Sequence, residues 1–305
     1  MKIYGAGIAG LLAANAFPTA QVFEAGPEGS TTHKALLRFR SSAVGDAVGI
    51  DFKKVRVHKG IWHEGRFMTP NIQLANLYSQ KVIGRIADRS IWNLDSVDRY
   101  IAPEDFIEQL VDRCRNRITY DAAIGEVELS DRSKESEPVI STIPMPVLAN
   151  YYSGKQYLQA HNIEFKSAPI HVVRFRVFDC EAYQTIYFPG KNTGVYRASI
   201  TGDMLIIEVA DGHASFHLEE ITTAFGIDLG QIDEIEKVSQ RFGKIASIND
   251  KWRRRFIFET SHDQAIYSLG RFATWRNILL DDVLKDINVI KKLMNGTSYE
   301  RKLAQ

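Results

Sequence analysis

The feature that most constrains this chain is a glycine-rich turn close to its start. A short strand at 2–4 is followed at once by a G-x-G-x-x-G motif and then by an apolar run of helical character at 11–17; the motif reads Gly5-Ala6-Gly7-Ile8-Ala9-Gly10. In such a motif the first glycine permits a tight turn, the second lets backbone N–H groups approach a diphosphate, and the third lets the helix pack closely on the strand. The motif predicts a dinucleotide site at a helix N-terminus, where the helix dipole favours negative charge.

An acidic residue stands at the distance that this motif requires. Residues 21–23 form a second predicted strand, and Glu24 follows it, 19 positions after Gly5 (24 − 5). A carboxylate at this place binds the ribose hydroxyls of the adenosine, with Ala25 beside it. A 2′-phosphate would meet the charge of Glu24, which argues against NADP. The motif by itself leaves NAD and FAD open.

Composition excludes several other classes. The net charge is +1, which gives no overall electrostatic reason to expect a nucleic acid or a membrane surface as partner. The sequence has no run of 18 apolar residues, so no membrane span is expected. Cys114 and Cys180 are far apart in sequence, which favours a reduced, cytoplasmic setting. His58 and His63 lack the spacing of metal ligands, and no metal site is predicted.

The middle of the chain first continues the α/β pattern. Helices are expected at 75–86 and 103–115, and strands at 118–120, 124–129 and 138–144. From 171 the period changes to that of β structure. Strands are expected at 171–178, 182–188, 194–200 and 204–209, followed by helices at 218–225 and 232–242.

The pattern finally returns to a strand at 265–269 and a helix at 278–293. We read the β-rich segment as an antiparallel sheet inserted into the nucleotide-binding lobe. The predicted division is 1–145 for the first part of that lobe, 146–260 for a substrate domain, and 261–305 for the return.

Two cationic segments have two interpretations each. The segment 33–40, which includes Arg38, is either a solvated helix turn or places one cation on the cofactor diphosphate or a substrate anion. The run 251–255 is the most basic stretch, and it is read as a solvated loop or strand edge, otherwise as an anion-binding rim. Of the first segment, Arg38 is the candidate cofactor contact.

Three stretches together resemble a known family. They are the opening motif with Glu24, the strand 139–144, and a closing stretch that runs from 269 to 282 with Gly270-Arg271, Trp275-Arg276-Asn277 and Asp281-Asp282. This order is similar to the FAD flavoproteins of the glutathione-reductase type, in the branch of the amine oxidases and UDP-galactopyranose mutase. The mutases have a similar closing motif, in which a second aromatic stands where this chain has Asn277.

The resemblance implies a cofactor and its contacts. In such proteins the opening motif holds the ADP half of FAD and the closing strand–turn–helix meets the flavin, which implies contacts from Gly270, Arg271, Asn277 and Ile278. This pairing of the chain ends favours FAD over NAD. The chain departs from the family in lacking the usual Gly-Gly-Arg shortly after the ribose acid, and it has no CxxC pair, which excludes the disulfide reductases.

The fold that follows is α/β: a Rossmann-type FAD-binding lobe, with a parallel sheet and helices, and an inserted antiparallel β-sheet substrate lobe. Candidate catalytic residues are Tyr187, Arg197 and Trp275. Arg197 is suited to hold a carboxylate or phosphate by two parallel hydrogen bonds. The structural alternative is that Tyr187 and Tyr196 form a cross-strand aromatic pair and that Arg197 points to solvent.

Three functions remain for such a chain. The first is an FAD-dependent oxidoreductase, similar to amine oxidases, that acts on a small polar or amine-bearing substrate. The second is a flavoenzyme similar to UDP-galactopyranose mutase that acts on a nucleotide sugar. The third is a flavoprotein that binds or acts on a nucleotide or a modified nucleic-acid base, suggested by the basic stretches 113–117 and 251–255. The near-neutral charge disfavours the third.

Overall fold

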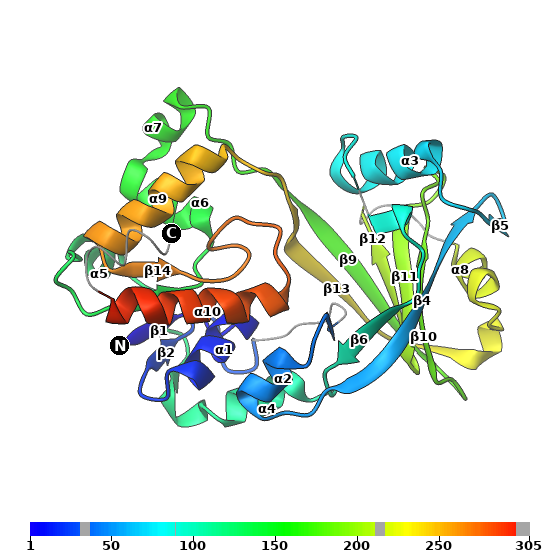
Figure 1. The fold of residues 1–305 in the computed structure, drawn as a ribbon, viewed down its shortest axis with the longest axis horizontal. Helices are drawn as coiled ribbons and strands as arrows, with labels where there is room; N and C mark the ends of the chain where they lie inside the picture. Colours follow the sequence, from blue (N-terminus) through cyan, green and yellow to red (C-terminus); the bar gives the residue numbers. More distant parts are fainter. Residues whose placement is uncertain (31–36, 89, 211–216, 297–305) are drawn as a thin grey trace.

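The computed structural model describes residues 1–30, 37–88, 90–210 and 217–296, which form two lobes, each built on one sheet (Figure 1). The first lobe contains a five-stranded sheet and the chain ends, and the second contains a nine-stranded sheet. The predicted α/β class, with a Rossmann-type lobe and a separate β lobe, is confirmed.

The sheet of the first lobe is parallel throughout. Register pairs Ile3 with Val22 on one side and with Ile140 on the other, so β1 is central. The order is β14-β8-β1-β2-β7, with bounds β14 Ile266–Ser268, β8 Val139–Ser141, β1 Lys2–Tyr4, β2 Gln21–Phe23 and β7 Ile118–Thr119.

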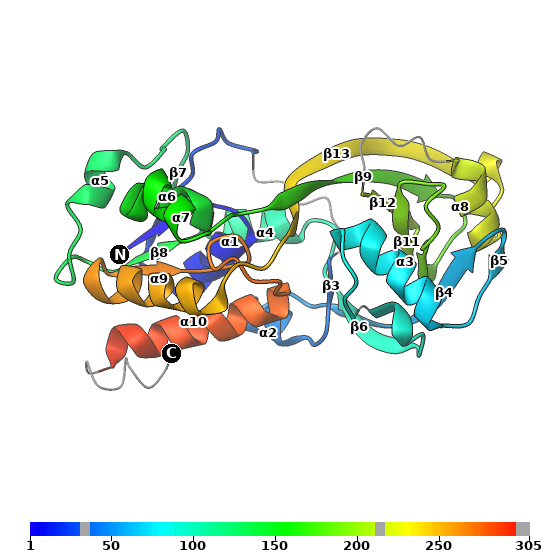
Figure 2. The same cartoon turned by 90° about the horizontal axis from the view of Figure 1, so that it is seen from above.

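Helices cover both faces of this sheet. The two faces are told apart at β14, where Tyr267 packs with residues of α1 and α10 while Ile266 packs with residues of α6 and α9. Figure 2 shows α10 and α6 on opposite sides of the lobe. The helices are α1 Ile8–Ala16, α2 Ala43–Val48, α4 Phe106–Asp112, α5 Glu126–Ser130, α6 Met145–Ser153, α7 Lys155–Ala160, α9 Asp250–Asp263 and α10 Leu280–Asn295.

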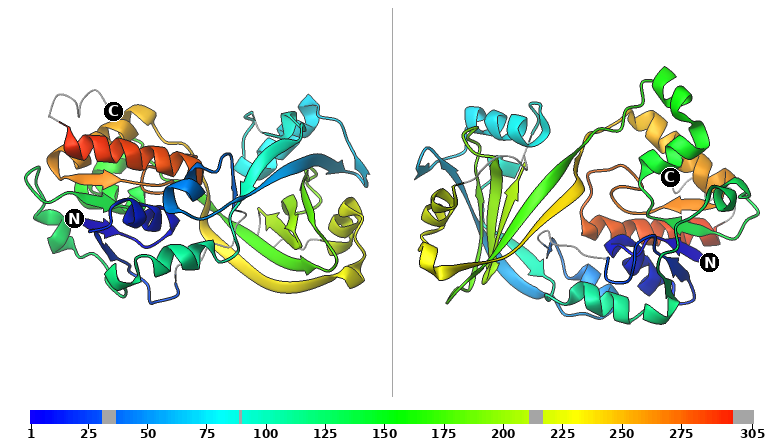
Figure 3. Two further views of the ribbon diagram at one scale, coloured as in Figure 1. Left: turned by 60° about the horizontal axis from the view of Figure 1, so that its bottom comes forward. Right: turned by 180° about the vertical axis from the view of Figure 1, so that it is seen from behind.

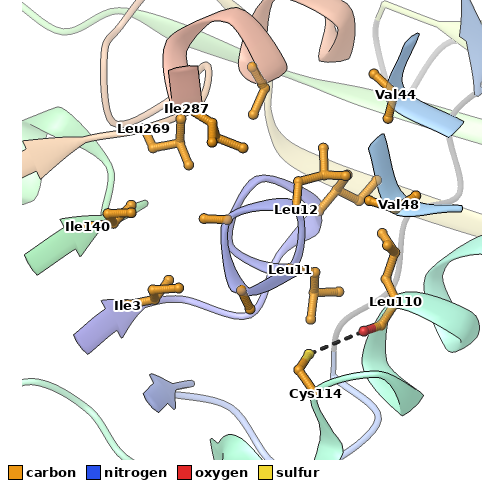
Figure 4. Packing of buried hydrophobic residues seen from close by; sticks show 14 of the residues in the cluster. Ile3, Leu11, Leu12, Val44, Val48, Leu110, Cys114, Ile140, Leu269 and Ile287 are labelled. Atoms are coloured by element: carbon orange, nitrogen blue, oxygen red, sulfur yellow. Dashed lines mark hydrogen bonds between the residues drawn. The ribbon is translucent and has the colours of Figure 1, made fainter. Parts of the chain in front are cut away.

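The core of the first lobe surrounds α1. Leu11 and Leu12 are almost completely buried, and Figure 4 shows them between β1, α2, α4 and α10. Burial of each such side chain contributes roughly 1.5–3 kcal/mol to folding. Cys114 belongs to this core, where its thiol donates to the carbonyl oxygen of Leu110 at 3.2 Å. The apolar character of 8–17 is therefore explained by burial on several sides.

The second sheet is mixed and draws on two parts of the sequence. Its order is β13-β9-β12-β11-β10-β4-β6-β3, with β5 paired to β4. Neighbours are antiparallel except β4 and β10, which are parallel. The bounds are β3 Arg38–Phe39, β4 Lys53–His63, β5 Arg66–Phe67, β6 Val97–Ile101, β9 Ser167–Val177, β10 Ala182–Tyr187, β11 Val195–Gly202, β12 Met204–Val209 and β13 Ile232–Ile245.

The strand pairing differs from the predicted division of the chain. Residues 38–101 provide β3 to β6 of the second sheet, although the sequence assigned them to the first lobe with the rest of 1–145. The contact of β4 with β10 joins residues more than one hundred positions apart, and local patterns carry no information about such a pairing. Figures 2 and 3 show β9 and β13 as long curved strands that extend toward the first lobe.

One helix packs on each face of the second sheet. The helix α8 Leu218–Phe225 covers a face formed by Ala198, Leu205 and Ile207, while α3 Ile72–Ile83 covers part of the other face. The remainder of that second face carries polar side chains of β10 and β11, and it is described below with the site.

Three local predictions were wrong. Residues 232–242 form strand β13, because the long antiparallel pairing with β9 overrides the helical spacing of the apolar residues. This pairing has register shifts between Glu234 and Glu236 and between Gln240 and Lys244. Residues 124–129 include the short helix α5 instead of a strand. The basic run 251–255 lies in α9 instead of a loop; Asn249 caps this helix by accepting from Trp252 N at 3.0 Å.

A partly buried lysine holds one turn of the second lobe. Lys81 of α3 donates to the carbonyl oxygens of Phe188 at 2.9 Å and Gly190 at 2.6 Å, in the turn after β10. Burial lowers the pKa of Lys81 to about 7. The ammonium thus ties α3 to the sheet, at an electrostatic cost.

This lysine makes a testable prediction about pH. The pKa of Lys81 is lower in the folded protein than its ordinary 10.5, so the unfolded chain binds more protons between these values and stability rises with pH there. The free energy of unfolding of the wild type, minus that of Lys81→Met, should increase from about pH 7 to about pH 10, by at most about 1.4 kcal/mol per pH unit. Urea unfolding at several pH values measures this difference in the free energy of unfolding. Lys155→Met, at an exposed lysine, is the control. A flat difference would contradict the burial of the ammonium.

A second prediction concerns the closest approach of α1 to β1. A Cβ at Gly10 would lie 1.9 Å from the carbonyl oxygen of Gly5, whereas a Cβ at Gly7 would have no neighbour within 4 Å. Gly10→Ala should lower the free energy of unfolding by more than about 2 kcal/mol, since backbone must shift. The control Gly7→Ala should change it by less than about 0.5 kcal/mol. Equal thermal stability of the two variants would refute this packing.

Candidate functional site

The G-x-G-x-x-G motif adopts the strand–turn–helix form that the sequence predicts. Gly5 has φ +94°, in the left-handed region that favours glycine, and it leads from β1 into α1. Gly7 is the N-cap of α1, and none of the described side chains caps this end. Because nothing within 4 Å would meet a Cβ at Gly7, the N–H groups of the first turn are accessible to a ligand.

Glu24 lies beside this helix N-terminus. Its Oε2 accepts from Ala6 N at 2.6 Å and its Oε1 accepts from Gly26 N at 3.0 Å. The carboxylate therefore fixes the glycine turn and the following loop, in addition to the predicted contact with a ribose. Ala25 is exposed next to it.

The closing loop packs directly on the opening motif. Gly270 has φ +89°, and a Cβ placed on it would be 2.9 Å from Cβ of Ala9. Leu269 N donates to Ser141 O at 2.8 Å, which continues the pairing of β14 with β8 up to this glycine. The two ends of the chain thus meet at the N-terminus of α1, as the resemblance implies.

Arg271 and Asn277 lie on the same loop. Arg271 Nη2 donates to Asn277 Oδ1 at 3.1 Å, while Arg271 Nε is buried without a hydrogen-bond partner among the described residues. Burial lowers the pKa of Arg271, and the proximity of Tyr196 opposes this effect. Arg271 of the first lobe therefore lies near the polar face of the second sheet. Ile278 is partly buried against the core around α1.

Trp275 has a structural position. Its side chain is 3% exposed, its Nε1 donates to Ala246 O at 2.9 Å, and its ring meets that of Phe165 edge-on at 5.1 Å. It has φ +47°, a strained value for an aromatic residue. The environment argues against the predicted catalytic role and assigns Trp275 to holding the closing loop against the connection between β13 and α9.

Arg38 is a partly buried cation with neutral hydrogen-bond partners. Its guanidinium donates to Thr185 Oγ1 at 2.7 Å, to Thr201 Oγ1 at 2.6 Å and to Gln184 O at 3.2 Å. None of the described carboxylates forms an ion pair with it. Burial, and then the charge of Arg197, lower the pKa of Arg38 to about 9, so it remains charged at neutral pH.

Arg38 belongs to β3, and its side chain contacts β10 and β11 of the second sheet. It therefore does not lie on a solvated helix turn, which was one interpretation of the segment 33–40. Residues 33–36 of that segment lie outside the described residues. Arg40, two positions later, donates to Asp282 Oδ2 at 2.7 Å at the start of α10.

Arg197 forms a buried ion pair with Glu208 on the neighbouring strand. Arg197 Nη2 donates to Glu208 Oε1 at 2.7 Å, and Arg197 Nε donates to Oε2. Burial would raise the pKa of Glu208, but the adjacent Arg197 charge holds it below its ordinary value. The Arg197 guanidinium is therefore paired on the sheet, while 33% of its side chain remains exposed. Glu208 was not predicted, although a single carboxylate within the apolar stretch 204–209 is a signal for a buried pair.

The aromatic residues of this face gather around a tyrosine that the sequence analysis missed. Tyr78 of α3 packs edge-on against Tyr187 at 5.4 Å and lies 6.4 Å from Tyr196, between ring centroids. Tyr187 is 5% exposed. Burial raises the pKa of Tyr196, and Lys244 Nζ lies 4.5 Å from the centre of its ring. Tyr187 is thus a packing residue, and Tyr196 is the tyrosine near Arg271.

The candidate site residues belong to two surfaces, which are linked by the electrostatic effect of Tyr196 on Arg271. One is the N-terminus of α1 with Glu24 and the closing loop, and the other is the polar face of the second sheet. The uncapped N-terminus, the open space at Gly7 and the buried Nε of Arg271 without a partner fit the diphosphate and flavin of FAD. FAD, when bound, supplies the electron-transfer chemistry.

The basic run 251–255 has a simpler explanation than nucleic-acid binding. Arg254 Nε lies 2.7 Å from Asp250 Oδ2 and Arg255 Nε lies 2.6 Å from Glu259 Oε1, both on α9 itself. In the described part of the chain, no cluster of His, Cys, Asp or Glu is suited to a metal ion. No described helix combines the length and apolar character of a membrane span.

The fold is that of FAD-dependent flavoproteins, the class that the opening and closing motifs resemble. Structure comparison aligns the chain with reduced UDP-galactopyranose mutase at a TM-score of 0.65, with 14% identity over 98% of this chain and 96% of that one. It also matches a CLA-producing fatty acid isomerase from P. acnes at a TM-score of 0.57, with 11% identity and coverage of 95% and 97%.

A third similar structure is an oxidoreductase from Methanosarcina mazei, at a TM-score of 0.55 with 10% identity and coverage of 96% and 100%. Neither the models of known protein families nor the sequences of curated proteins match the chain. At these identities the likeness establishes the fold, and this fold is the one that the resemblance of the opening and closing motifs implies.

The position of Glu24 makes a prediction about cofactor affinity. Glu24→Ala should lower FAD affinity about tenfold or more, because a hydrogen bond to a charged group contributes roughly 1.5–3 kcal/mol. It should also destabilise the protein without FAD by about 1–3 kcal/mol, since Ala6 N and Gly26 N lose their acceptor.

The matched variant Glu24→Gln keeps one acceptor oxygen and should be milder on both counts. Flavin content after purification and thermal unfolding without FAD measure the two effects separately. Unchanged flavin content in both variants would rule out the ribose contact.

Proposed function

We propose that this protein is an FAD-dependent oxidoreductase of the amine-oxidase type that acts on a small polar or amine-bearing substrate with an anionic group. The observation that supports the cofactor most is the meeting of the chain ends, where Gly270 packs on Ala9 beside the uncapped N-terminus of α1. A phosphate-binding helix end and a closing loop at one place suit a cofactor with a diphosphate and a flavin.

The anionic group of the substrate is argued from charge. On the polar face, Arg197 is neutralised by Glu208, whereas Arg38 has only hydroxyl and carbonyl partners among the described residues. Arg271 approaches the same face from the closing loop. An excess of partly buried positive charge favours an anion such as a carboxylate or a phosphate. Among the described residues, the Nε of Arg271 has no partner and is available to such a group, whereas most donors of Arg38 are engaged by β10 and β11. These residues would bind and orient the substrate toward the flavin.

A mutase-like function on a nucleotide sugar is the second candidate. It is supported by the alignment of nearly the whole chain with UDP-galactopyranose mutase, 98% of this chain at a TM-score of 0.65. A diphosphate would suit the same cations. The two candidates differ in electron balance, because a mutase reaction consumes no acceptor. Action on a modified nucleic-acid base is the third, and the pairing of the arginines of α9 with acids on the same helix weakens it.

The experiment begins with the absorption spectrum of the purified protein and mass identification of the molecule released on denaturation. We expect FAD; a colourless protein that cannot be reconstituted with FAD would overturn the proposal. Anaerobic flavin reduction is then titrated with amino acids and with the matching amines that lack the carboxylate. Reduction at lower concentration by the carboxylated member of each pair is the expected result.

Arg38→Lys tests the substrate contact. The ammonium keeps the charge but loses the planar fork, so half-saturation of flavin reduction should rise about tenfold at unchanged flavin content. Thermal unfolding controls for folding. If no amine reduces the flavin, and a nucleotide sugar turns over only after chemical reduction of the flavin with no acceptor consumed, the mutase candidate replaces the oxidoreductase.

A further inference from the structure

A groove lies between α9 and α10, on the far side of the closing loop from the motif around Gly7. It runs along β14, the edge strand of the first sheet, which among the described strands pairs only with β8. Its volume is about 730 Å³, within the range of about 300–1,000 Å³ that holds small organic ligands. Figure 1 shows α9 and α10 on either side of β14.

The body of the groove is apolar. One wall carries Ile257 and Phe258 of α9, at adjacent helical positions, and the other carries Val289, Ile290 and Leu293 of α10, which share one face by their spacing of three and four. Val289 is 38% exposed, so the wall is accessible to a ligand. Such walls favour an aromatic or aliphatic body.

One end of the groove is cationic. Arg253 Nη1 donates to Thr274 O at 3.3 Å and Arg276 Nε donates to Thr274 Oγ1 at 3.1 Å, so the two guanidinium groups are held at the same residue of the closing loop. Arg254 also lines the groove and is 71% exposed at its side chain.

The nearby acids leave this end positively charged. Asp250 is shared by Arg253 and Arg254, whereas Arg276 pairs with Asp286. Two carboxylates therefore face three guanidinium groups, and one positive charge of this set is not balanced. A single anionic head group would balance this positive charge and accept two parallel hydrogen bonds from a guanidinium.

A buried hydroxyl in the lining lacks a partner. Ser268 of β14 is 8% exposed, and its Oγ has no hydrogen-bond partner among the described residues. Buried polar atoms are satisfied in the great majority of cases, because an unpaired one costs about 1–3 kcal/mol. Because Ser268 lines the groove, a polar atom of a ligand bound there is the candidate partner of this hydroxyl.

We propose that this groove is a second ligand site, which binds a small organic molecule with an apolar body and one anionic head group, a phosphate monoester or a carboxylate. The proposal does not depend on the reaction at the flavin. Ser268 and Thr274 both line the groove, and Gly270 lies between them in the sequence. The ligand would therefore contact the closing loop, whose Gly270 packs on Ala9.

The test uses 1-naphthyl phosphate and 1-naphthoate as probes, with the protein saturated with FAD so that the site around Gly7 is filled. Calorimetric titration should give saturable binding of at least one probe, and the better one identifies the head group. Two controls should bind at least tenfold more weakly. They are 1-naphthol, which has the apolar ring but no anionic head group, and inorganic phosphate, which has the anion but no apolar body. Absence of saturable binding by both probes below about 1 mM would overturn the proposal, since this corresponds to less than about 4 kcal/mol.

Variants locate the binding. Arg254→Glu should weaken it at least fivefold, whereas Lys251→Glu, the same charge change at an exposed position of α9 outside the groove, should leave it within twofold. Ser268→Ala should weaken binding while leaving thermal stability without the probe unchanged or higher, because it removes an unpaired hydroxyl. Binding that is unaffected by both Arg254→Glu and Ser268→Ala would place the probe elsewhere and refute the site.

Discussion

The close backbone contact between Gly10 and Gly5 is the constraint on which the rest of this structure depends. It lets α1 lie against β1 without an intervening side chain, and this brings the N-terminus of α1 to the carboxyl end of the sheet. Gly270 then meets Ala9 from the other end of the chain. This geometry gives three features of a dinucleotide site. They are a helix end with accessible N–H groups, an acid beside that helix end, and a closing loop packed against it.

The strands of the first sheet were predicted well because their signals are local, whereas α5 and α9 of the same lobe were not. The glycine motif, the acid at position 24 and the strand before Gly270 each depend on residues within a few positions of one another. The second lobe was harder. The strand 232–245 has apolar residues at helical spacing and becomes a strand only through its long pairing with β9, in which bulges correct the register. The placement of the strands β3 to β6 in the second sheet depends on the pairing of β4 with β10, which no local pattern encodes.

The residues of the candidate site also divide into those that local motifs predicted and those that depend on distant strands. The residues around α1 and the closing loop were predicted from motifs, whereas the environment of Arg38 was not, because its partners Thr185 and Thr201 come from distant strands. Glu208 decides the state of Arg197 from the next strand. Trp275 illustrates the opposite error: a motif marked it as a candidate, yet its packing with Phe165 and its bond to Ala246 make it part of the scaffold. Proximity in a motif does not tell which way a side chain points.

The path of the chain between the lobes has a consequence for synthesis on the ribosome. The glycine turn at 5–10 is made long before β14, which extends its sheet and begins at Ile266, and before α10, which covers its helix and begins at Leu280. The second sheet likewise waits for β10 before β4 gains its parallel neighbour. Neither lobe is a contiguous stretch that can fold while the remainder is being translated. Much apolar surface of the early segments therefore has no native partner until β14 and α10 have been translated, a period in which a chain depends on chaperones and is prone to aggregate.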